Sequence, residues 1–403
     1  MPVDFDAIVV GAGPAGTAAA YDLHCAGHRV LLVDRRSFPR MKPCGGGITI
    51  KTLKRLRWAV TPVLETATRR LRMGVSGVAR PRQAVFEAGS DVCTFAVRAA
   101  FDAYNLDRVV EAGVQFQRVD GISSIAVDGH GVRAAFGDRT VSAKYLVGAD
   151  GANSTVRRLT GPAPWFRRGF AIEGLVPNAA IGEPPIAQFL FGQVRHGYGW
   201  LFPKRDHVNA GIYTWDDAVT LGKDQLTAYV RDRLGVDAVD HMVGFPIGFG
   251  AHTAPRGSER IVLVGDAGGF AEPLLGEGIH NAVKSGQAAA AAIDAVESGR
   301  AVRLPDAYRH ATAPIRSDLA TYERAKRLFY AGSGAAGFRA LGARPVRTAM
   351  MRGFAAGLTL DEIVRPFPFS LLYVASPFFH AGPPASILAT PPTAPTARRA
   401  RPE

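Results

Sequence analysis

The chain has 403 residues, 47% hydrophobic and 21% charged, so it can form two or three domains and is too apolar for a disordered protein. Its three cysteines are odd in number and widely spaced, which argues against a disulfide framework or a zinc site and indicates a reducing compartment. The net charge of +13 is uneven: residues 301–403 hold 14 lysines and arginines against 6 acidic residues, a balance of +8. This excess predicts an anionic partner or surface.

The chain begins with an apolar strand at residues 7–10, a glycine-rich turn and a helical stretch at residues 17–23. In the turn Gly11-Ala12-Gly13-Pro14-Ala15-Gly16, Gly11 permits a tight bend, Gly13 lets the backbone approach phosphate, and Gly16 lets helix and strand pack closely. A helix N-terminus after such a turn binds pyrophosphate through its amides. We therefore expect a dinucleotide at Gly11, Gly13, Ala15 and Gly16.

The second predicted strand, residues 30–33, ends in Asp34. An acidic residue about 20 positions after the glycine turn accepts hydrogen bonds from ribose hydroxyls. Arg35 and Arg36 follow it, and they could meet a 2′-phosphate, which would indicate NADP. A solvated turn beside the ribose is the simpler interpretation, with Arg35 near the cofactor.

Residues 39–47 form a loop rich in proline and glycine, which excludes regular structure. We expect this loop to cross the cofactor. Cys44 stands between proline and three glycines, so no side chain packs beside its thiol and the backbone at Gly45 can approach a ligand. The alternative role of Cys44 is that of a small buried hydrophobic residue.

Residues 58–95 alternate apolar and polar types, which predicts antiparallel strands. A helix at residues 97–110 follows, and Arg98 at its start is placed to bind phosphate or adenosine oxygens, unless it is an ordinary surface arginine. Strands and hairpins at residues 114–147 then lead to Asp150-Gly151, where a strand ends in an acid and a glycine.

Short β-rich runs fill residues 165–250, with one helix near residues 223–234. Within them Tyr198, Trp200 and Phe202 alternate, so on a strand they share one face and could line an apolar slot. An aromatic core stripe is the alternative. The neighbouring glycines and Pro203 favour the slot.

A strand at residues 260–264 then leads to Gly265-Asp266, and an alanine-rich helix follows at residues 278–297. Asp266 could bond a ribitol or ribose hydroxyl while the helix amides face phosphate, or it could serve only as a helix N-cap. The further cofactor contacts that we expect in this segment are Gly265, Gly276, Gly278 and Ile279.

The last part of the chain is helical in pattern. It includes apolar residues at helical spacing with arginines nearby, which could lie on an anionic membrane or pack on the body of the protein. The apolar residues are Val346, Met350, Met351, Phe354 and Leu358, and the arginines are Arg339, Arg344, Arg347 and Arg352.

Together these elements predict an α/β fold in which a Rossmann-type FAD-binding domain is interleaved with a β-sheet-rich substrate domain and followed by a C-terminal helical region. The expected boundaries are 1–57, 96–164 and 255–300 for the FAD-binding domain, 58–95 and 165–254 for the substrate domain, 301–382 for the helical region, and 383–403 for a disordered tail.

The glycine turn, Asp34, Arg98, Asp150-Gly151 and Gly265-Asp266, in this order, resemble the flavoproteins of the p-hydroxybenzoate hydroxylase fold. Residues 42–47 and 198–203 are also similar to the geranylgeranyl reductase family, whose members hydrogenate prenyl double bonds in chlorophyll side chains, archaeal lipids and quinones. The likeness covers residues 4–300. At His280-Asn281 the chain departs from the aromatic residues of the family pattern.

The resemblance implies FAD as cofactor and hydride transfer from reduced flavin to an isolated double bond in a dry site, with a proton for the neighbouring carbon. It places Cys44, Tyr198 and Trp200 at the reaction and Tyr198, Trp200, Phe202 and Pro203 along the prenyl chain. The proton could come from Cys44, Tyr198 or water. With one complete dinucleotide fingerprint in the sequence, electrons would come from transiently bound NADPH or from a reduced donor protein.

Two other functions share these motifs: an aromatic or quinone monooxygenase on the same fold, and a flavin-binding protein without catalysis. No apolar run reaches the roughly 18 residues of a membrane span, and the N-terminus lacks a signal-peptide pattern. We expect a cytoplasmic protein, with peripheral contact at the inner face of the membrane, and no nucleic-acid partner because the arginines lack interleaved aromatic residues.

Overall fold

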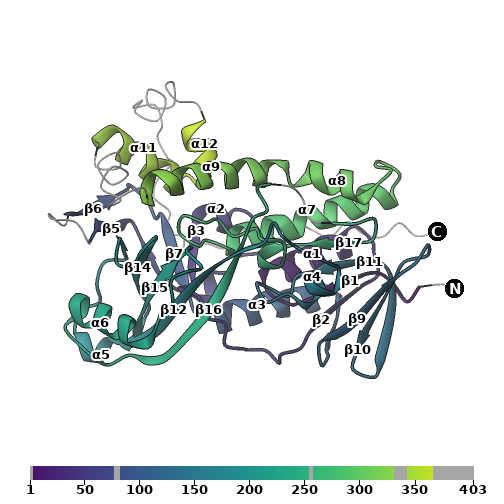
Figure 1. Cartoon of the computed structure of the whole chain (residues 1–403), viewed down its shortest axis with the longest axis horizontal. Helices are drawn as coiled ribbons and strands as arrows, with labels where there is room; N and C mark the ends of the chain where they lie inside the picture. Colours follow the sequence, from purple (N-terminus) through teal and green to yellow (C-terminus); the bar gives the residue numbers. More distant parts are fainter. Residues whose placement is uncertain (1–2, 77–81, 254–256, 331–342, 366–403) are drawn as a thin grey trace.

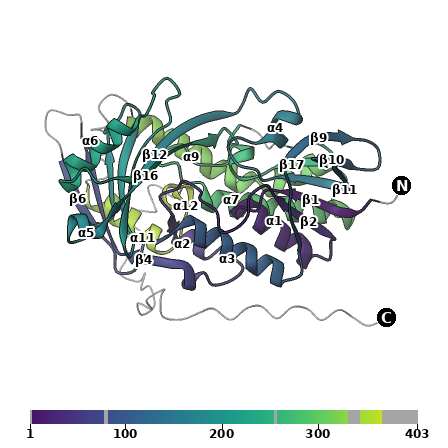
Figure 2. The same cartoon turned by 90° about the horizontal axis from the view of Figure 1, so that it is seen from below.

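The computed structural model describes residues 3–76, 82–253, 257–330 and 343–365. The predicted tail at 383–403 and Arg339 lie outside these residues. The described chain forms two large sheets, one small sheet and a set of covering helices. The first sheet with α1, α3 and α7 lies at one end of the molecule, and the second sheet with α5 and α6 lies at the other (Figures 1 and 2).

The first sheet carries the predicted nucleotide motifs. Its parallel strands are ordered β8-β2-β1-β11, β17 adds to β11 in parallel, and β10 and β9 continue the sheet antiparallel. Apolar runs such as those in β1 and β2 are buried on both faces, as parallel strands covered by helices require. The strands are β1 (Phe5–Val10), β2 (Val30–Asp34), β8 (Gln115–Arg118), β9 (Ile122–Val127), β10 (Val132–Phe136), β11 (Arg139–Gly148) and β17 (Ile261–Leu263).

Two alanine-rich helices, α1 (Pro14–Cys25) and α7 (Ile279–Glu297), pack closely against each other in the FAD-binding part of the chain. A Cβ added at Gly286 of α7 would come within 2.2 Å of the carbonyl oxygen of Ala15 in α1. Small residues at this contact therefore let the first turn of α1 lie directly against α7. The helix α3 (Arg98–Glu111), close to the bounds predicted from the sequence, also contacts α1.

The second sheet is largely antiparallel, with the strand order β16-β12-β15-β14-β13-β5-β6, and only β13 and β5 pair in parallel. The short helices α5 (Asn178–Ile181) and α6 (Lys223–Leu234) belong to this part, and α6 has the predicted bounds. The strands are β5 (Arg70–Val75), β6 (Arg82–Glu87), β12 (Arg167–Pro177), β13 (Gln188–Phe191), β14 (Gly197–Pro203), β15 (His207–Thr214) and β16 (Asp240–Phe249).

The antiparallel strands predicted at residues 58–95 divide between two sheets. Of these, β5 and β6 join the second sheet, whereas β4 (Leu64–Thr68) pairs with β7 (Cys93–Ala96) in a small sheet that β3 (Gly47–Thr49) completes. The small sheet thus ties the glycine loop before β3 to the strand that leads into α3. The remaining short elements here are α2 (Ile50–Leu53) and the 3-10 turn η1 (Thr61–Val63).

The helices after α7 lie along the two sheets. In Figure 1, α9 (Ala313–Tyr330) runs from α8 (Leu304–Ala311), beside the first sheet, toward α11 (Arg344–Ala355), which contacts β6, and α12 (Leu360–Val364), which packs on α9. Val346, Met350 and Phe354 of α11 are partly buried against the aromatic cluster of the second sheet. The apolar face of this helix therefore packs on the body, the second of the two arrangements expected from the sequence.

Candidate active site

The glycine turn between β1 and α1 has the shape of a pyrophosphate cradle. Gly11 has a φ of +107°, and a Cβ on Gly16 would come within 1.7 Å of the carbonyl oxygen of Gly11. The N-cap of α1 is Gly13, and no described side chain caps this helix. Uncapped amides at a helix start are suitable donors for a phosphate group, so the turn fits the cofactor predicted for it.

Asp34, at the end of β2, fixes the glycine turn to the second strand. Its Oδ2 accepts a hydrogen bond from the Ala12 amide at 2.8 Å, and its Oδ1 accepts one from the Arg36 amide at 2.8 Å. A carboxylate has further acceptor capacity, which suits the predicted ribose contact. Arg35 and Arg36 are exposed, in agreement with a solvated turn.

Arg98 is not a surface arginine, because it is buried at the start of α3 and paired with Asp102 one turn later. Its Nε and Nη2 donate to the two carboxylate oxygens at 2.9 and 2.7 Å. Arg40 joins the pair, with its Nη1 3.2 Å from Oδ2 of Asp102. Burial would lower the pKa of Arg98, but Asp102 and the nearby Cys44 raise it above its ordinary value. The result is a fixed positive charge beside the cysteine loop.

Asp150 and Asp266 differ in their surroundings. Asp150 accepts hydrogen bonds from the Thr155 and Val156 amides at 2.6 and 3.0 Å, at the start of α4 (Thr155–Leu159). Asp266 lies in the 3-10 turn η2 (Gly265–Gly268), and the N-cap of α7 is Gly278, so Asp266 does not cap that helix. Burial raises the pKa of Asp266, against the opposing effect of Lys42 and Arg98.

The remaining predicted cofactor residues lie between η2 and α7. Gly276 has a φ of +69° and lies against Tyr213, while Ile279 is buried as the first residue of α7. A Cβ on Gly278 would come within 3.2 Å of Oδ1 of Asp266. Asp266 therefore lies close to the start of α7. The glycine turn at residues 11–16 and the segment at Gly265 also meet, since a Cβ on Gly265 would come within 3.0 Å of Cβ of Ala15.

The cysteine loop is held by polar groups of the second sheet. The Cys44 amide donates to Oε1 of Glu173 at 2.8 Å, and the Gly46 amide donates to the Cys44 sulfur at 3.4 Å. The ammonium of Lys204 donates to the carbonyl oxygens of Gly45 at 2.8 Å and Ala96 at 3.2 Å. These bonds fix the backbone on both sides of the half-buried thiol.

Tyr198, Trp200 and Phe202 lie on β14 and, as predicted, share one face of the strand. All three are buried among other aromatic rings of the second sheet. The Tyr198 hydroxyl donates to the carbonyl oxygen of Leu275 at 2.5 Å, and the Trp200 indole donates to Oδ1 of Asn209 at 2.7 Å. Pro203 ends the strand.

The cysteine loop and the aromatic stripe lie against each other. A Cβ added at Gly45 would come within 2.7 Å of Cδ2 of Phe202 and 3.1 Å of Nε1 of Trp200. Two motifs more than 150 positions apart are thus in direct contact, and a side chain at position 45 would require the Phe202 ring to shift. This juxtaposition brings the cysteine loop onto the aromatic stripe, while the Cys44 side chain itself packs against the neighbouring apolar cluster that contains Ile48 and Phe101.

Buried ionisable groups surround this contact. Burial raises the pKa of Glu173 above its ordinary value and lowers the pKa of Lys204 to about 8. Burial also lowers the pKa of Lys42, which lies over the ring of Phe245 at 3.2 Å, to about 8. The common cause of these shifts is burial, which disfavours the charged form of each group.

The sequence predictions missed Glu173, Asn209, Lys204 and Glu272. Glu173 is the one acidic residue in the strand β12, which was a usable signal for a buried polar role. Asn209 and Lys204 gave no signal, because only strand pairing brings them next to Trp200 and the cysteine loop. Glu272 accepts hydrogen bonds from the amides of Leu274, Leu275 and Glu277, and burial raises its pKa to about 7.

The chain is similar in sequence to known flavoproteins and reductases. The sequence profile described as FAD binding domain matches residues 4–187. The chain is 31% identical over 312 residues to menaquinone reductase of Mycolicibacterium smegmatis, covering 71% of this chain and 75% of that protein. It is 30% identical over 315 residues to geranylgeranyl diphosphate reductase of Rhodobacter capsulatus, covering 74% of this chain and 78% of that protein.

A solved structure supports the fold. The geranylgeranyl bacteriochlorophyll reductase-like protein of Thermoplasma acidophilum superposes with a TM-score of 0.72 at 20% identity. The match covers 92% of this chain and 95% of that one. The predicted α/β architecture, with an FAD-binding fold and a sheet-rich second part, is confirmed. Within the described residues, none of the helices is long and apolar enough to cross a membrane.

Proposed function

Because the chain belongs to the geranylgeranyl reductase family of FAD-dependent oxidoreductases, we propose that it hydrogenates isolated double bonds of a prenyl chain in a lipid, quinone or pigment. The observation that carries the proposal is the contact of Gly45 with Trp200 and Phe202. It joins the cysteine loop, which we place at the cofactor, to an aromatic wall suited to a prenyl chain.

FAD, when bound and reduced, supplies the hydride that an isolated alkene needs. We assign the pyrophosphate to the amides of Gly13, Ala15 and Gly16, with Arg35 beside the ribose at Asp34. The other residues that we propose to contact the cofactor are Gly11, Cys44, Gly45, Arg98, Asp150, Gly265, Asp266, Gly276, Gly278 and Ile279.

Tyr198, Trp200, Phe202 and Pro203 bind the chain and exclude water from it in this proposal. Because these rings are buried against one another, a prenyl chain enters only when side chains of the cluster turn aside. Cys44 delivers the proton to the carbon next to the one that receives hydride. Burial raises the pKa of Tyr198 well above its ordinary value, so its hydroxyl keeps its proton and serves chiefly to hold Leu275.

Electrons come from NADPH or from a reduced donor protein in this proposal, because the one complete dinucleotide fingerprint is assigned to FAD. The basic balance of residues 301–403 supports contact with an anionic membrane, where prenyl substrates reside. Reduction of the bound flavin by NADPH under anaerobic conditions, followed by absorbance, separates the two electron sources.

The test is mass spectrometry of lipids, quinones and pigments from cells with and without the protein. A two-hydrogen mass increase in one isoprenoid identifies the substrate, and no shift in any class contradicts the proposal. Oxygen uptake coupled to hydroxylation would instead indicate a monooxygenase on the same fold. Flavin that turns over with none of these compounds would indicate a protein without this catalysis.

A further inference from the structure

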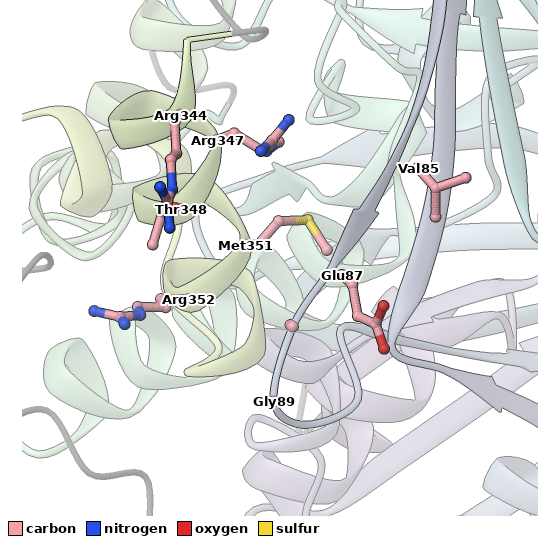
Figure 3. A pocket seen from close by; sticks show the side chains of 9 residues that line it. Val85, Glu87, Gly89, Arg344, Arg347, Thr348, Met351 and Arg352 are labelled. Carbon is pink, nitrogen blue, oxygen red and sulfur yellow. The ribbon is translucent and has the colours of Figure 1, made fainter.

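A cavity of about 390 Å³ lies between the strand β6 and the helix α11, away from the cysteine loop. Its size falls within the range of about 300–1,000 Å³ typical of small-molecule sites. Figure 3 shows Arg347 and Met351 pointing from α11 toward the strand that carries Val85 and Glu87. The lining residues are Val85, Glu87, Ala88, Gly89, Arg344, Arg347, Thr348, Met351 and Arg352.

The polar side of the cavity is basic. In the part of the chain that the structure describes, neither Arg344 nor Arg347 has a carboxylate partner, and the guanidinium of Arg347 lies 5.7 Å from the centre of the Phe86 ring. The one acidic lining residue, Glu87, is 68% exposed and has Nε of Arg70 at 4.0 Å. The charge of Glu87 is thus partly offset by Arg70, which lies outside the cavity. The arginines of α11 therefore give the cavity wall a net positive charge.

The other side of the cavity is apolar and continuous with the aromatic stripe. Met351 is buried, and it belongs with Phe86 to the same cluster as Tyr198 and Trp200. Within this cluster, ring centres are 6.0 Å apart between Trp200 and Tyr198, and 5.8 Å between Tyr198 and Phe191. The ring centres of Phe191 and Phe329 on α9 are 5.5 Å apart. Through Met351 the cavity therefore borders the same apolar cluster that contains the aromatic stripe.

We propose that this cavity binds the phosphate or diphosphate head group of the prenyl substrate, with Arg347 as its main anchor and Arg344 and Arg352 at the rim. This inference rests on the proposed function and specifies its substrate class as a prenyl chain with an anionic head. A guanidinium binds phosphate through two parallel hydrogen bonds, and the Thr348 hydroxyl adds a donor. Binding at a remote anchor positions the double bond at the flavin.

The phosphate of an anionic membrane lipid offers the same chemistry, so the experiment compares both sources. Arg347→Gln is tested with geranylgeranyl diphosphate, with the neutral alcohol geranylgeraniol, and with vesicles that contain phosphatidylglycerol. We expect the dissociation constant and KM for the diphosphate to rise about 10- to 100-fold, as for loss of a charged hydrogen bond. Binding of the alcohol and of the vesicles should stay within about twofold.

Two variants keep the test decisive. Arg309→Gln removes the same charge from α8, where Arg309 is exposed and pairs with Asp306, and it should leave every value unchanged. Arg347→Lys keeps the charge and should recover part of the affinity for the diphosphate. Flavin content and thermal unfolding confirm that each variant is folded.

Equal diphosphate binding by Arg347→Gln and the wild type would overturn the inference, even if reduction of neutral prenyl substrates supports the proposed function. Loss of vesicle binding with unchanged diphosphate affinity would also overturn it and would assign the cavity to membrane lipid. Diphosphate binding that depends on Arg347, without reduction of any prenyl compound, would support the site and contradict the proposed function.

Discussion

Gly45 lies against the ring of Phe202, where a Cβ on the glycine would come within 2.7 Å of Cδ2. The residues come from different parts of the fold: Gly45 precedes the small sheet, and Phe202 lies in β14 of the second sheet. Their contact, together with the bond from Lys204 to the Gly45 carbonyl, holds the cysteine loop on the aromatic stripe. The loop can keep this position only while residue 45 has no side chain.

Gly45→Ala should therefore displace the loop. The added methyl group overlaps Phe202, and overpacking of this kind costs about 1–3 kcal/mol of unfolding free energy. Reductase activity should fall with it, because Cys44 moves as well. Gly47→Ala is the matched control, since its nearest neighbouring atom would be 3.7 Å away. Urea unfolding and single-turnover kinetics measure both effects, and equal behaviour of the two variants would contradict the packing argument.

Cys44→Ala should keep FAD but lower kcat about 100-fold, the size of effect expected when a positioned proton donor is lost. Cys93→Ala removes a second thiol from the same region. Burial raises the pKa of Cys93 to about 12, and its sulfur donates to the carbonyl oxygens of Ile48 and Thr94, so we assign it no part in the reaction. Turnover assays should show wild-type kcat for Cys93→Ala; an unchanged kcat for Cys44→Ala would exclude Cys44 as the donor.

Lys204→Met should change how stability depends on pH. Burial lowers the pKa of Lys204 to about 8 in the folded protein, below its ordinary value of 10.5. Between these values the unfolded chain holds a proton that the folded chain has released, so the wild type gains stability relative to the variant as pH rises. The gain is up to about 1.4 kcal/mol per pH unit above pH 8, with none below. Urea unfolding of both proteins from about pH 7 to about pH 9.5 measures this difference; a constant difference would show that the lysine titrates normally.

Asp34→Ala should weaken FAD binding about 10- to 100-fold, because two amide hydrogen bonds to a charged group are lost and the glycine turn is released from β2. Flavin fluorescence titration of the apoprotein measures the affinity. Asp4→Ala is the control, since Asp4 also accepts a backbone amide, that of Ser142, but at the far end of the first sheet. Wild-type flavin affinity in Asp34→Ala would contradict the assignment of this carboxylate to the ribose.

Much of the fold could be predicted from the sequence, because its signals are local. The strand, turn and helix around Gly11 follow from apolar runs and glycines within 25 residues, and α6 was predicted with the bounds that the structure shows. The division of residues 58–95 between two sheets could not be predicted, since alternation of side chains indicates a strand but not its partner.

The site was predictable only in part. Cys44 and the Tyr198-Trp200-Phe202 stripe stood out because unusual residue types occur together in short segments. Glu173 and Lys204 are far along the chain from the cysteine loop. Their hydrogen bonds with Cys44 and Gly45 form only because the loop docks on the second sheet. The basic pattern around Arg347 was visible in the sequence, but the cavity that it lines depends on the packing of α11 beside β6.

We propose that this flavoenzyme adds two hydrogens to an isolated prenyl double bond. The direct measurement is an anaerobic single turnover, in which the reduced holoenzyme is mixed with geranylgeranyl diphosphate or geranylgeraniol, neither of which has a quinone ring that could accept the electrons instead. We predict reoxidation of the flavin together with a product two hydrogens heavier by mass spectrometry. If the flavin stays reduced with every prenyl compound, and reoxidises only when oxygen is admitted and the substrate is hydroxylated, the protein is not a prenyl reductase.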